Sequence, residues 1–185
     1  GAAGGRLGMN ISFPSKTALI TGAAHGFGRA IALAFAARGA HVLACDLLGD
    51  ELAETQALCA QAGGTCETSV VDVTDRGAVF AFAGNRPVDI LVNNAGGVLG
   101  PVGQPLERVG ATEWQAIFDV NVSAAFYFAQ AVAPHMKSRR AGRIVNISSG
   151  AGLGISMTGI QAYASAKAAQ ADSRRPGCRW RRETE

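Results

Sequence analysis

The sequence is poor in features that mark membrane and secreted proteins. No uninterrupted apolar run reaches the roughly 18 to 20 residues that span a bilayer. The opening GAAGGRLG lacks the basic start and apolar centre of a signal peptide. We therefore expect a cytoplasmic protein without a membrane span, in which residues 1–14 are a leader or tag outside the folded domain.

Cysteines and aromatic residues are also scarce. The chain has four cysteines, none of them in a CxxC or metal-ligand spacing, and only 6% aromatic residues. Free thiols are therefore expected in place of a disulfide framework, and no metal site is predicted. The 48% of hydrophobic residues and the 24 glycines are typical of a single domain in which strands and helices alternate.

The net charge of +3 is small, and most of it comes from one end of the chain. Residues 172–185 hold five arginines against three acidic residues, with Trp180 as their one aromatic residue. A basic tail of this kind is not a basic binding face, so we expect no specific nucleic-acid binding. A nucleic-acid binder would instead show an affinity for nucleic acid that falls steeply with salt. That affinity would also survive replacement of Asp46, the acidic residue that ends the second predicted strand.

Short apolar runs alternate with longer helical patterns along most of the chain. The runs predict strands, and the segments between them predict helices: strands at 17–21, 41–46, 68–73, 89–94 and 143–148, helices at 28–38, 51–61, 75–83 and 113–137. The strands are almost continuously apolar, as strands buried on both faces are. We predict an α/β fold over residues 15–171, a Rossmann-like doubly wound parallel sheet with helices on both faces. Thr112 and Gln115 predict a capping box for the last helix.

Three glycines stand between the first strand and the first helix, in TGAAHGFG at residues 21–28. Gly22 would permit a tight turn, Gly26 would let a ligand approach the backbone, and Gly28 would let the helix pack on the strand. The helix N-terminus would then offer free N–H groups to a pyrophosphate. A glycine triplet alone is weak evidence, because ordinary turns also need glycine.

Asp46 strengthens the case for a dinucleotide. It ends the second predicted strand, 18 residues after Gly28, where a carboxylate can accept both hydroxyls of an adenosine ribose. The same carboxylate would repel a 2′-phosphate, and no arginine stands beside it. NAD is therefore favoured over NADP as the cofactor.

The ends of the next strands add to the same edge of the sheet. Asp72 ends the third strand, where it could meet the adenine, and the small-residue turn NNAGG at 93–97 ends the fourth. Because the carboxyl ends of parallel strands meet at one edge, these segments predict a single ligand crevice.

Tyr163 and Lys167 are four residues apart and would share one face of a helix. An ammonium there favours the ionised phenol, which makes Tyr163 a candidate general acid and base. A surface tyrosine stacked on a lysine stem would look identical in the sequence. Ser149, 14 residues before Tyr163, could bind a substrate carbonyl, whereas Ser148 is expected to face the other way.

Asn121 lies among apolar residues in the long predicted helix, where asparagine is a mediocre helix former. Two interpretations are open. It is either a solvent-facing residue of an amphipathic helix, or a buried one whose partners include a water-linked relay to Lys167.

Together these motifs resemble those of the short-chain dehydrogenase/reductase family. TGAAHGFG is similar to its TGxxxGxG motif, NNAG to its strand-four motif and YASAK to its YxxxK motif, over about residues 15–171. The resemblance implies hydride transfer between a nicotinamide and a ketone or secondary alcohol. It also implies a possible homo-oligomer through the 113–137 helix.

The same resemblance implies roles for individual residues. Tyr163 would move the proton, Ser149 would polarise the carbonyl, Lys167 would hold the nicotinamide ribose, and Asn121 would complete a proton relay. The predicted cofactor-binding residues are Gly22, His25, Gly26, Phe27, Gly28, Asp46, Asp72, Val73, Asn94, Ala95, Gly96, Tyr163 and Lys167.

The sequence departs from the family pattern after Ala171. The helix that carries Tyr163 gives way to DSRRPGCRWRRETE, in which Pro176 and Gly177 would end it. The further strands and the substrate-covering segment that the family implies are not found, so the 143–148 strand is expected at an exposed sheet edge. The alternative interpretation is a truncated, catalytically weak or inactive relative that retains only dinucleotide binding.

Overall fold

The computed structural model describes residues 11–100, 102–154 and 159–172. Most of the expected leader (residues 1–10) and nearly all of the arginine-rich tail (residues 173–185) lie outside the described residues. The expectations about those two segments therefore stay predictions.

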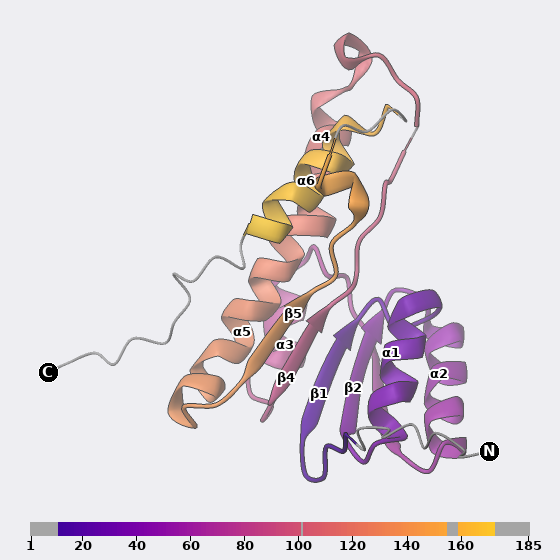
Figure 1. The fold of residues 1–185 in the computed structure, drawn as a ribbon, viewed down its shortest axis with the longest axis vertical. Helices are drawn as coiled ribbons and strands as arrows, with labels where there is room; N and C mark the ends of the chain where they lie inside the picture. Colours follow the sequence, from indigo (N-terminus) through magenta and orange to yellow (C-terminus); the bar gives the residue numbers. More distant parts are fainter. Residues whose placement is uncertain (1–10, 101, 155–158, 173–185) are drawn as a thin grey trace, which may run out of the picture.

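The centre of the molecule is a five-stranded parallel sheet (Figure 1). Its strand order is β3-β2-β1-β4-β5, so the direction of the winding reverses between β1 and β4. The strands are β1 (Thr17–Thr21), β2 (His41–Asp46), β3 (Thr65–Val70), β4 (Ile90–Asn93) and β5 (Arg143–Asn146). This arrangement confirms the predicted doubly wound, Rossmann-like fold, and it creates a switch point at which such sheets bind ligands.

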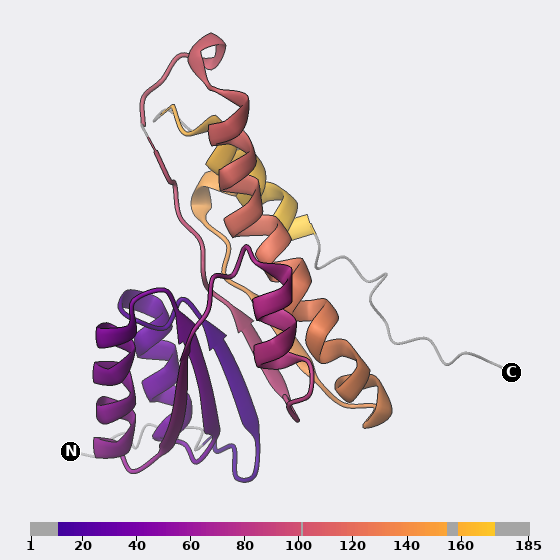
Figure 2. The same ribbon diagram turned by 180° about the vertical axis from the view of Figure 1, so that it is seen from behind.

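Helices cover both faces of the sheet, as the opposite views of Figures 1 and 2 show. The α-helices are α1 (Gly26–Ala36), α2 (Gly49–Gln61), α3 (Arg76–Ala83), α4 (Ala111–Phe118), α5 (Ala124–Ser138) and α6 (Gln161–Asp172). Two single turns of 3₁₀-helix, η1 (Leu106–Arg108) and η3 (Gly150–Gly152), and a π-helical turn, η2 (Asp119–Ser123), complete the set.

The alternation of side chains along β1 builds two hydrophobic layers. Ala18 and Ile20 pack in one cluster with α1 and α2, whereas Leu19 packs on the other face with α3 and α5. Since successive strand residues point to opposite faces, one apolar strand supplies both layers. The sheet is thereby held rigidly on both sides near the switch point.

A third, smaller cluster lies where α6 crosses α4. Ala162 and Ala166 are buried against Ile117, with Trp114 and Tyr163 packed around them. This contact fixes α6 beyond the carboxyl end of the sheet, where Figure 2 shows the two helices side by side. It also sets the position of Tyr163.

Two details of the predicted elements were wrong. The third strand runs from Thr65 to Val70 in place of 68–73, and the residues of β3 and β5 are exposed or half-buried, so neither strand is buried on both faces. The predicted capping box is also wrong: α4 begins at Ala111, which places Thr112 inside its first turn. Glu113 instead accepts a hydrogen bond of 3.1 Å from the backbone N–H of Gly110.

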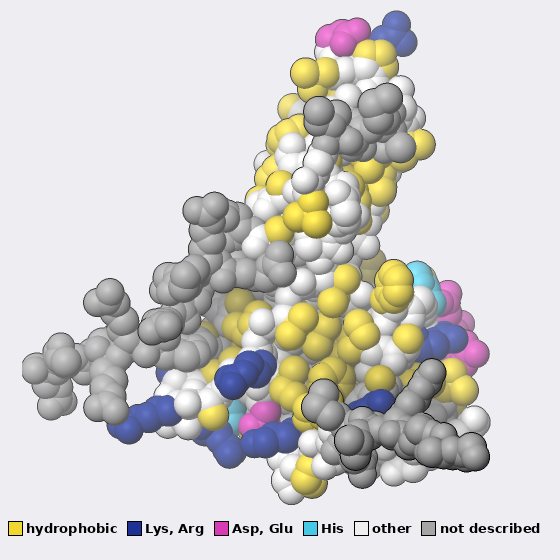
Figure 3. Space-filling model, in the orientation of Figure 1, with side chains coloured by type: hydrophobic (Ala, Val, Ile, Leu, Met, Phe, Trp, Pro, Cys, Tyr) yellow, Lys and Arg dark blue, Asp and Glu magenta, His cyan; other side chains and the backbone are white. Residues whose placement is uncertain are grey.

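Hydrophobic side chains gather on the face of the sheet around β1, β4 and β5 (Figure 3). Among the described residues β5 is the outermost strand on this side, and its residues Ile144 and Val145 are exposed. Within the described part of the chain, the expected exposed edge is therefore observed.

One helical stretch meets the criteria for a membrane span. Ala111–Ser138 is long and apolar enough by length and composition, with a mean hydropathy of 1.3 in its best window. A core helix of a soluble protein meets the same criteria, and this stretch packs against α3, α6 and β4. It is weak evidence, and the absence of a membrane span stays a prediction.

Candidate functional site

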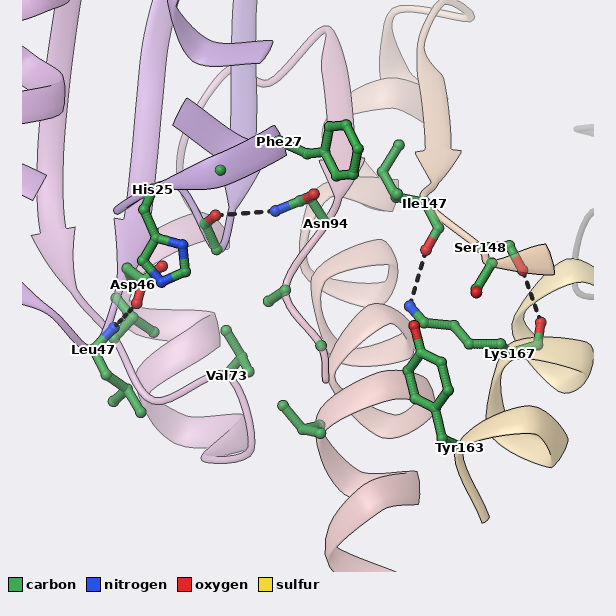
Figure 4. Close-up of a pocket in the computed structure, with 17 residues that line it drawn as sticks. His25, Phe27, Asp46, Leu47, Val73, Asn94, Ile147, Ser148, Tyr163 and Lys167 are labelled. Atoms are coloured by element: carbon green, nitrogen blue, oxygen red, sulfur yellow. Dashed lines mark hydrogen bonds between the residues drawn. The ribbon is translucent and has the colours of Figure 1, made fainter. Parts of the chain in front are cut away.

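A cavity of about 540 Å³ opens at the carboxyl end of the sheet. Its volume falls within the roughly 300 to 1,000 Å³ that ligand pockets occupy. It lies at the switch point between β1 and β4, as parallel sheets of this topology predict. It is lined by Gly22, His25, Gly26, Phe27, Asp46, Leu47, Val71, Val73, Asn94, Ala95, Gly96, Val120, Ile147, Ser148, Ser149, Tyr163 and Lys167 (Figure 4).

The three glycines of the β1–α1 loop have distinct surroundings. A β-carbon on Gly22, whose φ is +66°, would lie 2.8 Å from the Ala95 α-carbon, and one on Gly28 would overlap the Gly22 carbonyl oxygen. Gly26 has a φ of +56° and no neighbour within 4 Å of such a β-carbon. The first and third glycines therefore let the protein pack on itself, and the second leaves open space on the cavity wall.

Thr21 and Asn94 tie this loop to the end of β4. The Thr21 hydroxyl oxygen accepts hydrogen bonds from the backbone N–H groups of Asn94 (3.0 Å) and Ala95 (2.9 Å). The Asn94 amide donates to the carbonyls of Thr21 (3.1 Å) and Gly22 (3.0 Å). The Asn94 side chain thus supports the loop. Sequence analysis missed Thr21, although its place directly before the first glycine was a signal.

Asp46 ends β2 at the cavity wall, next to His25 (Figure 4). Its carboxylate accepts hydrogen bonds from the backbone N–H groups of Ala24 (3.1 Å) and Leu47 (2.7 Å). These bonds fix the carboxylate, and its two oxygens have lone pairs for further donors such as hydroxyl groups. Among the described residues that line the cavity there is no arginine.

Of the two predicted residues Asp72 and Val73, one lines the cavity and the other does not. Val73 lines the cavity, but Asp72 is exposed and is not among the lining residues. The Asp72 carboxylate accepts hydrogen bonds from the backbone N–H (2.9 Å) and the hydroxyl (2.7 Å) of Thr74, which lower the pKa of Asp72. The structure therefore does not bring Asp72 into the cavity, because a local turn holds its carboxylate.

Tyr163 and Lys167 share one face of α6 and both line the cavity. The Lys167 Nζ lies 5.7 Å from the centre of the Tyr163 ring. Figure 4 shows the Tyr163 hydroxyl directed toward the amine. The pair belongs to the cavity wall, unlike a tyrosine stacked on a lysine stem at the outer surface.

Lys167 is buried, with 4% of its surface exposed. Its Nζ donates hydrogen bonds of 2.9 Å to the carbonyl oxygen of Ile147 and to Oε1 of Gln170. Burial lowers the pKa of Lys167, since removal from water disfavours the charged form. Gln170 was not singled out from the sequence, although its place three residues after Lys167 put both on one helix face.

Ser148 and Ser149 both line the cavity, because β5 ends at Asn146 and the strand alternation does not extend to them. The Ser148 hydroxyl donates to the backbone carbonyl of Lys167 (3.0 Å). The Ser149 oxygen accepts from the backbone N–H of Ala151 (3.2 Å). A hydroxyl that accepts a bond can still donate its proton, so Ser149 suits a carbonyl ligand better than Ser148 does.

Asn121 is fully buried in the π-helical turn η2 and does not line the cavity. Its amide nitrogen donates to the carbonyls of Gly97 and Ile117, each at 2.8 Å, and its oxygen accepts from the Gly97 N–H (3.2 Å). Of the two interpretations of Asn121, the solvent-facing one is therefore wrong. A β-carbon on Gly96 would overlap the Asn121 oxygen and lie 3.3 Å from the Lys167 Nζ, so both groups adjoin Gly96.

The cavity thus gathers most of the residues predicted from the motifs. Gly28, Asp72 and Asn121 stand outside its lining. Four lining residues were not singled out from the sequence, namely Leu47, Val71, Val120 and Ile147, and the expectation that Ser148 faces away from the site was wrong, because Ser148 lines the cavity. The apolar side chains of these four residues carry no chemical signal of their own, so only the fold could identify them.

Comparison with known proteins agrees with these motifs. Residues 16–174 match a protein-family profile described as short chain dehydrogenase. The chain is 38% identical over 159 residues to a 2,3-dihydro-2,3-dihydroxybenzoate dehydrogenase of Bacillus subtilis, which covers 83% of this chain and 59% of that protein. It is 38% identical over 143 residues to a gluconate 5-dehydrogenase of Gluconobacter oxydans (75% and 55%). The chain therefore spans somewhat more than half of the length of these two relatives.

Solved structures share the fold. A 7α-hydroxysteroid dehydrogenase complexed with NADH and 7-oxo glycochenodeoxycholic acid superposes with a TM-score of 0.82 at 34% identity, over 89% of this chain and 64% of that one. A metagenomic short-chain oxidoreductase in complex with NADP gives a TM-score of 0.79 at 34% identity, over 86% and 73%. Proteins of this fold thus bind either dinucleotide.

Proposed function

The chain belongs to the short-chain dehydrogenase family, and from this premise we propose that it transfers a hydride between a nicotinamide dinucleotide and a ketone or secondary alcohol. The observation that carries the proposal is that one cavity joins the glycine loop and Asp46 to the Tyr163–Lys167 pair.

The cavity fits a dinucleotide in three respects. Its volume is about 540 Å³, its wall at Gly26 is open, and the fixed carboxylate of Asp46 stands at one end. Tyr163 and Lys167 stand at the other end, on α6 (Figure 4). An elongated ligand with a ribose at one end and a reactive ring at the other would meet both sets of groups.

A bound nicotinamide would supply or accept the hydride. The protein's part would be the proton and the orientation of the substrate. Tyr163 would donate its proton to the substrate oxygen during reduction and accept it during oxidation. Ser149 would hold that oxygen through its hydroxyl proton, and the ammonium of Lys167 would favour the ionised phenol.

Asn121 would act on this site from outside the cavity. It binds Gly97 and adjoins Gly96, so it would fix the loop residues that lie beside the Lys167 amine. A water-linked relay from Asn121 to Lys167 is part of the proposal, and its support is that both groups adjoin Gly96.

Of the two dinucleotides, we propose NAD. The support is the Asp46 carboxylate on the cavity wall together with the lack of arginine among the described lining residues. A carboxylate accepts ribose hydroxyls, but it repels a 2′-phosphate.

A turnover screen tests the proposal. The purified chain would be mixed with NADH and a panel of aliphatic, cyclic and hydroxy-acid ketones, and with NAD and the matching alcohols, while absorbance of the reduced cofactor is followed. We expect turnover of at least one member, with a rate that falls by at least about 100-fold in Tyr163→Phe. Cofactor binding without turnover of any member would favour the alternative, a relative that retains only dinucleotide binding.

A further inference from the structure

The tip of Lys167 is held by a buried side chain. Gln170 is 2% exposed, and its Oε1 accepts a hydrogen bond of 2.9 Å from the Lys167 Nζ. The carbonyl oxygen of Ile147 accepts a second bond from the same amine, also at 2.9 Å. The two acceptors come from α6 itself and from the segment after β5, so they hold the amine from two elements.

The chemistry of the two groups fixes the direction of this contact. An ammonium has three donors and no lone pair, so the amide must present its oxygen to the amine. Two of the three N–H groups are then used, and the third can reach a ligand in the cavity. A buried charge is costly unless it is hydrogen-bonded, so both acceptors favour the charged form of Lys167.

We propose that Gln170 is a positioning residue, which fixes the Lys167 amine at the cavity wall and keeps it protonated through the hydrogen bond from Nζ to Oε1. The proposal rests on the proposed function, because it assigns Gln170 a task in support of Lys167. Gln170 does not line the cavity, so it acts through the lysine alone.

The hydrogen-bond acceptors of the Lys167 amine are neutral oxygens, those of Gln170 and Ile147. On α6 the other titratable residues are Tyr163, whose ring centre lies 5.7 Å from the Lys167 Nζ, and Asp172 at the end of the helix. The elements packed on α6 contribute two acidic residues, Glu113 of α4 and Asp119 of η2. Glu113 binds the Gly110 N–H, and Asp119 accepts from Gln115 (2.8 Å). Among the described residues, no carboxylate forms an ion pair with Lys167.

The test measures the pKa of each lysine without cofactor or substrate. The chain contains three lysines, Lys16, Lys137 and Lys167. Trace acetylation across a pH series, read by mass spectrometry, reports how each amine titrates, and Lys16 and Lys137 serve as references within the same sample. The variants are Gln170→Met, which removes the acceptor at nearly equal length, and Gln170→Glu, which keeps an oxygen and adds a negative charge.

Opposite shifts are expected. Gln170→Met should lower the pKa of Lys167 by about one pH unit, and Gln170→Glu should raise it by a similar amount, since a lost acceptor and an added anion act in opposite directions. The references should not move. An unchanged Lys167 in both variants, or shifts of the same sign, would overturn the proposal. If Gln170→Met does not fold, the proposal is tested by Gln170→Glu alone, in which an unchanged or lowered pKa of Lys167 would overturn it.

A kinetic readout then separates this inference from the proposed function. The rate deficit of Gln170→Met should grow as the pH rises, because its lysine loses the proton before that of the wild type does. A deficit equal at every pH would contradict a role through the charge. Opposite labelling shifts in a chain that never turns over would instead overturn the oxidoreductase proposal and leave the Gln170 contact standing.

Discussion

The side chain of Asn121 pairs with both backbone groups of Gly97, 24 residues away in the sequence. Its amide donates to the Gly97 carbonyl at 2.8 Å and its oxygen accepts from the Gly97 N–H at 3.2 Å. A third bond, from the same amide to the Ile117 carbonyl, lies inside the helix and accompanies the π-helical turn. One buried side chain therefore joins the helix to the loop after β4.

Replacing Asn121 should therefore destabilise the fold as well as the site. Asn121→Ala leaves the N–H and the carbonyl of Gly97 without their partner, and we expect a loss of about 2 to 4 kcal/mol in the free energy of unfolding. Urea denaturation measures it. The exposed Asn85→Ala is the matched control, with an expected change below about 0.5 kcal/mol. Equal effects in the two variants would contradict a structural role for the Gly97 pairing.

Tyr163→Phe should strongly reduce turnover while the fold and the cavity persist. The change removes one hydroxyl and no packing carbon, so kcat should fall by about 100- to 10,000-fold, as expected when a general acid is lost. NADH affinity should change less than about threefold, since the ring still lines the cavity. Tyr127→Phe, on α5, is the control and should keep its rate. A Tyr163→Phe variant with wild-type kcat would exclude the phenol as the proton donor.

The buried amine of Lys167 should make stability depend on pH. Burial lowers its pKa from the ordinary 10.5, so the folded state gives up the proton before the unfolded state does. Below the folded-state pKa the amine is charged in both states, so the folded state bears the full cost of burying the charge. That cost disappears as the pH rises to the pKa of the unfolded state, because the amine is then neutral in both states. We therefore expect the wild type to gain stability relative to Lys167→Met between neutral pH and about 10.5. Thermal melts across that range measure the difference.

The exposed Lys137 provides the control for this pH series. The difference between the wild type and Lys137→Met should stay flat over the same range, because the charge of an exposed side chain bears no burial cost in the folded state. A flat line for Lys167→Met as well would mean that the amine is not desolvated in the folded protein.

Gly28 should tolerate no side chain, for steric reasons. Its β-carbon would overlap the Gly22 carbonyl and lie 2.7 Å from the Asn94 amide nitrogen. We expect Gly28→Ala to cost more than about 2 kcal/mol of stability, because the backbone of the loop must move. Gly150, with nothing within 4 Å of an added β-carbon, is the control. Equal melting temperatures for Gly28→Ala and Gly150→Ala would contradict the steric restriction at Gly28.

The sequence was sufficient to predict the fold and most of the cavity wall. Buried apolar runs gave β1 and β2 with their observed bounds, since both are central strands that the periodicity rules describe. The residues with distinctive chemistry, such as Asp46, Tyr163 and Lys167, were found for the same reason: strand ends and helix spacing determine where they lie.

The features that escaped prediction depend on contacts between distant segments. The partners of Asn121 include Gly97 across the loop, and the hydroxyl of Thr21 binds Asn94 from another strand. Asp72 appeared to be a ligand because it follows a strand, but a two-residue turn to Thr74 holds its carboxylate. β3 and β5 were predicted to be buried on both faces, yet their residues are exposed or half-buried, because burial depends on which elements cover each face and local periodicity does not contain that information.

The central claim is that the cavity holds a nicotinamide dinucleotide with Asp46 at its adenosine end. The most direct measurement is a fluorescence titration of the purified chain with NADH, in parallel with NADPH and with the Asp46→Ala variant. We expect saturable NADH binding, weaker NADPH binding, and an NADH affinity reduced about tenfold or more in Asp46→Ala as the ribose hydrogen bonds are lost. A folded chain that binds neither dinucleotide, or an NADH affinity unaffected by Asp46→Ala, would contradict it.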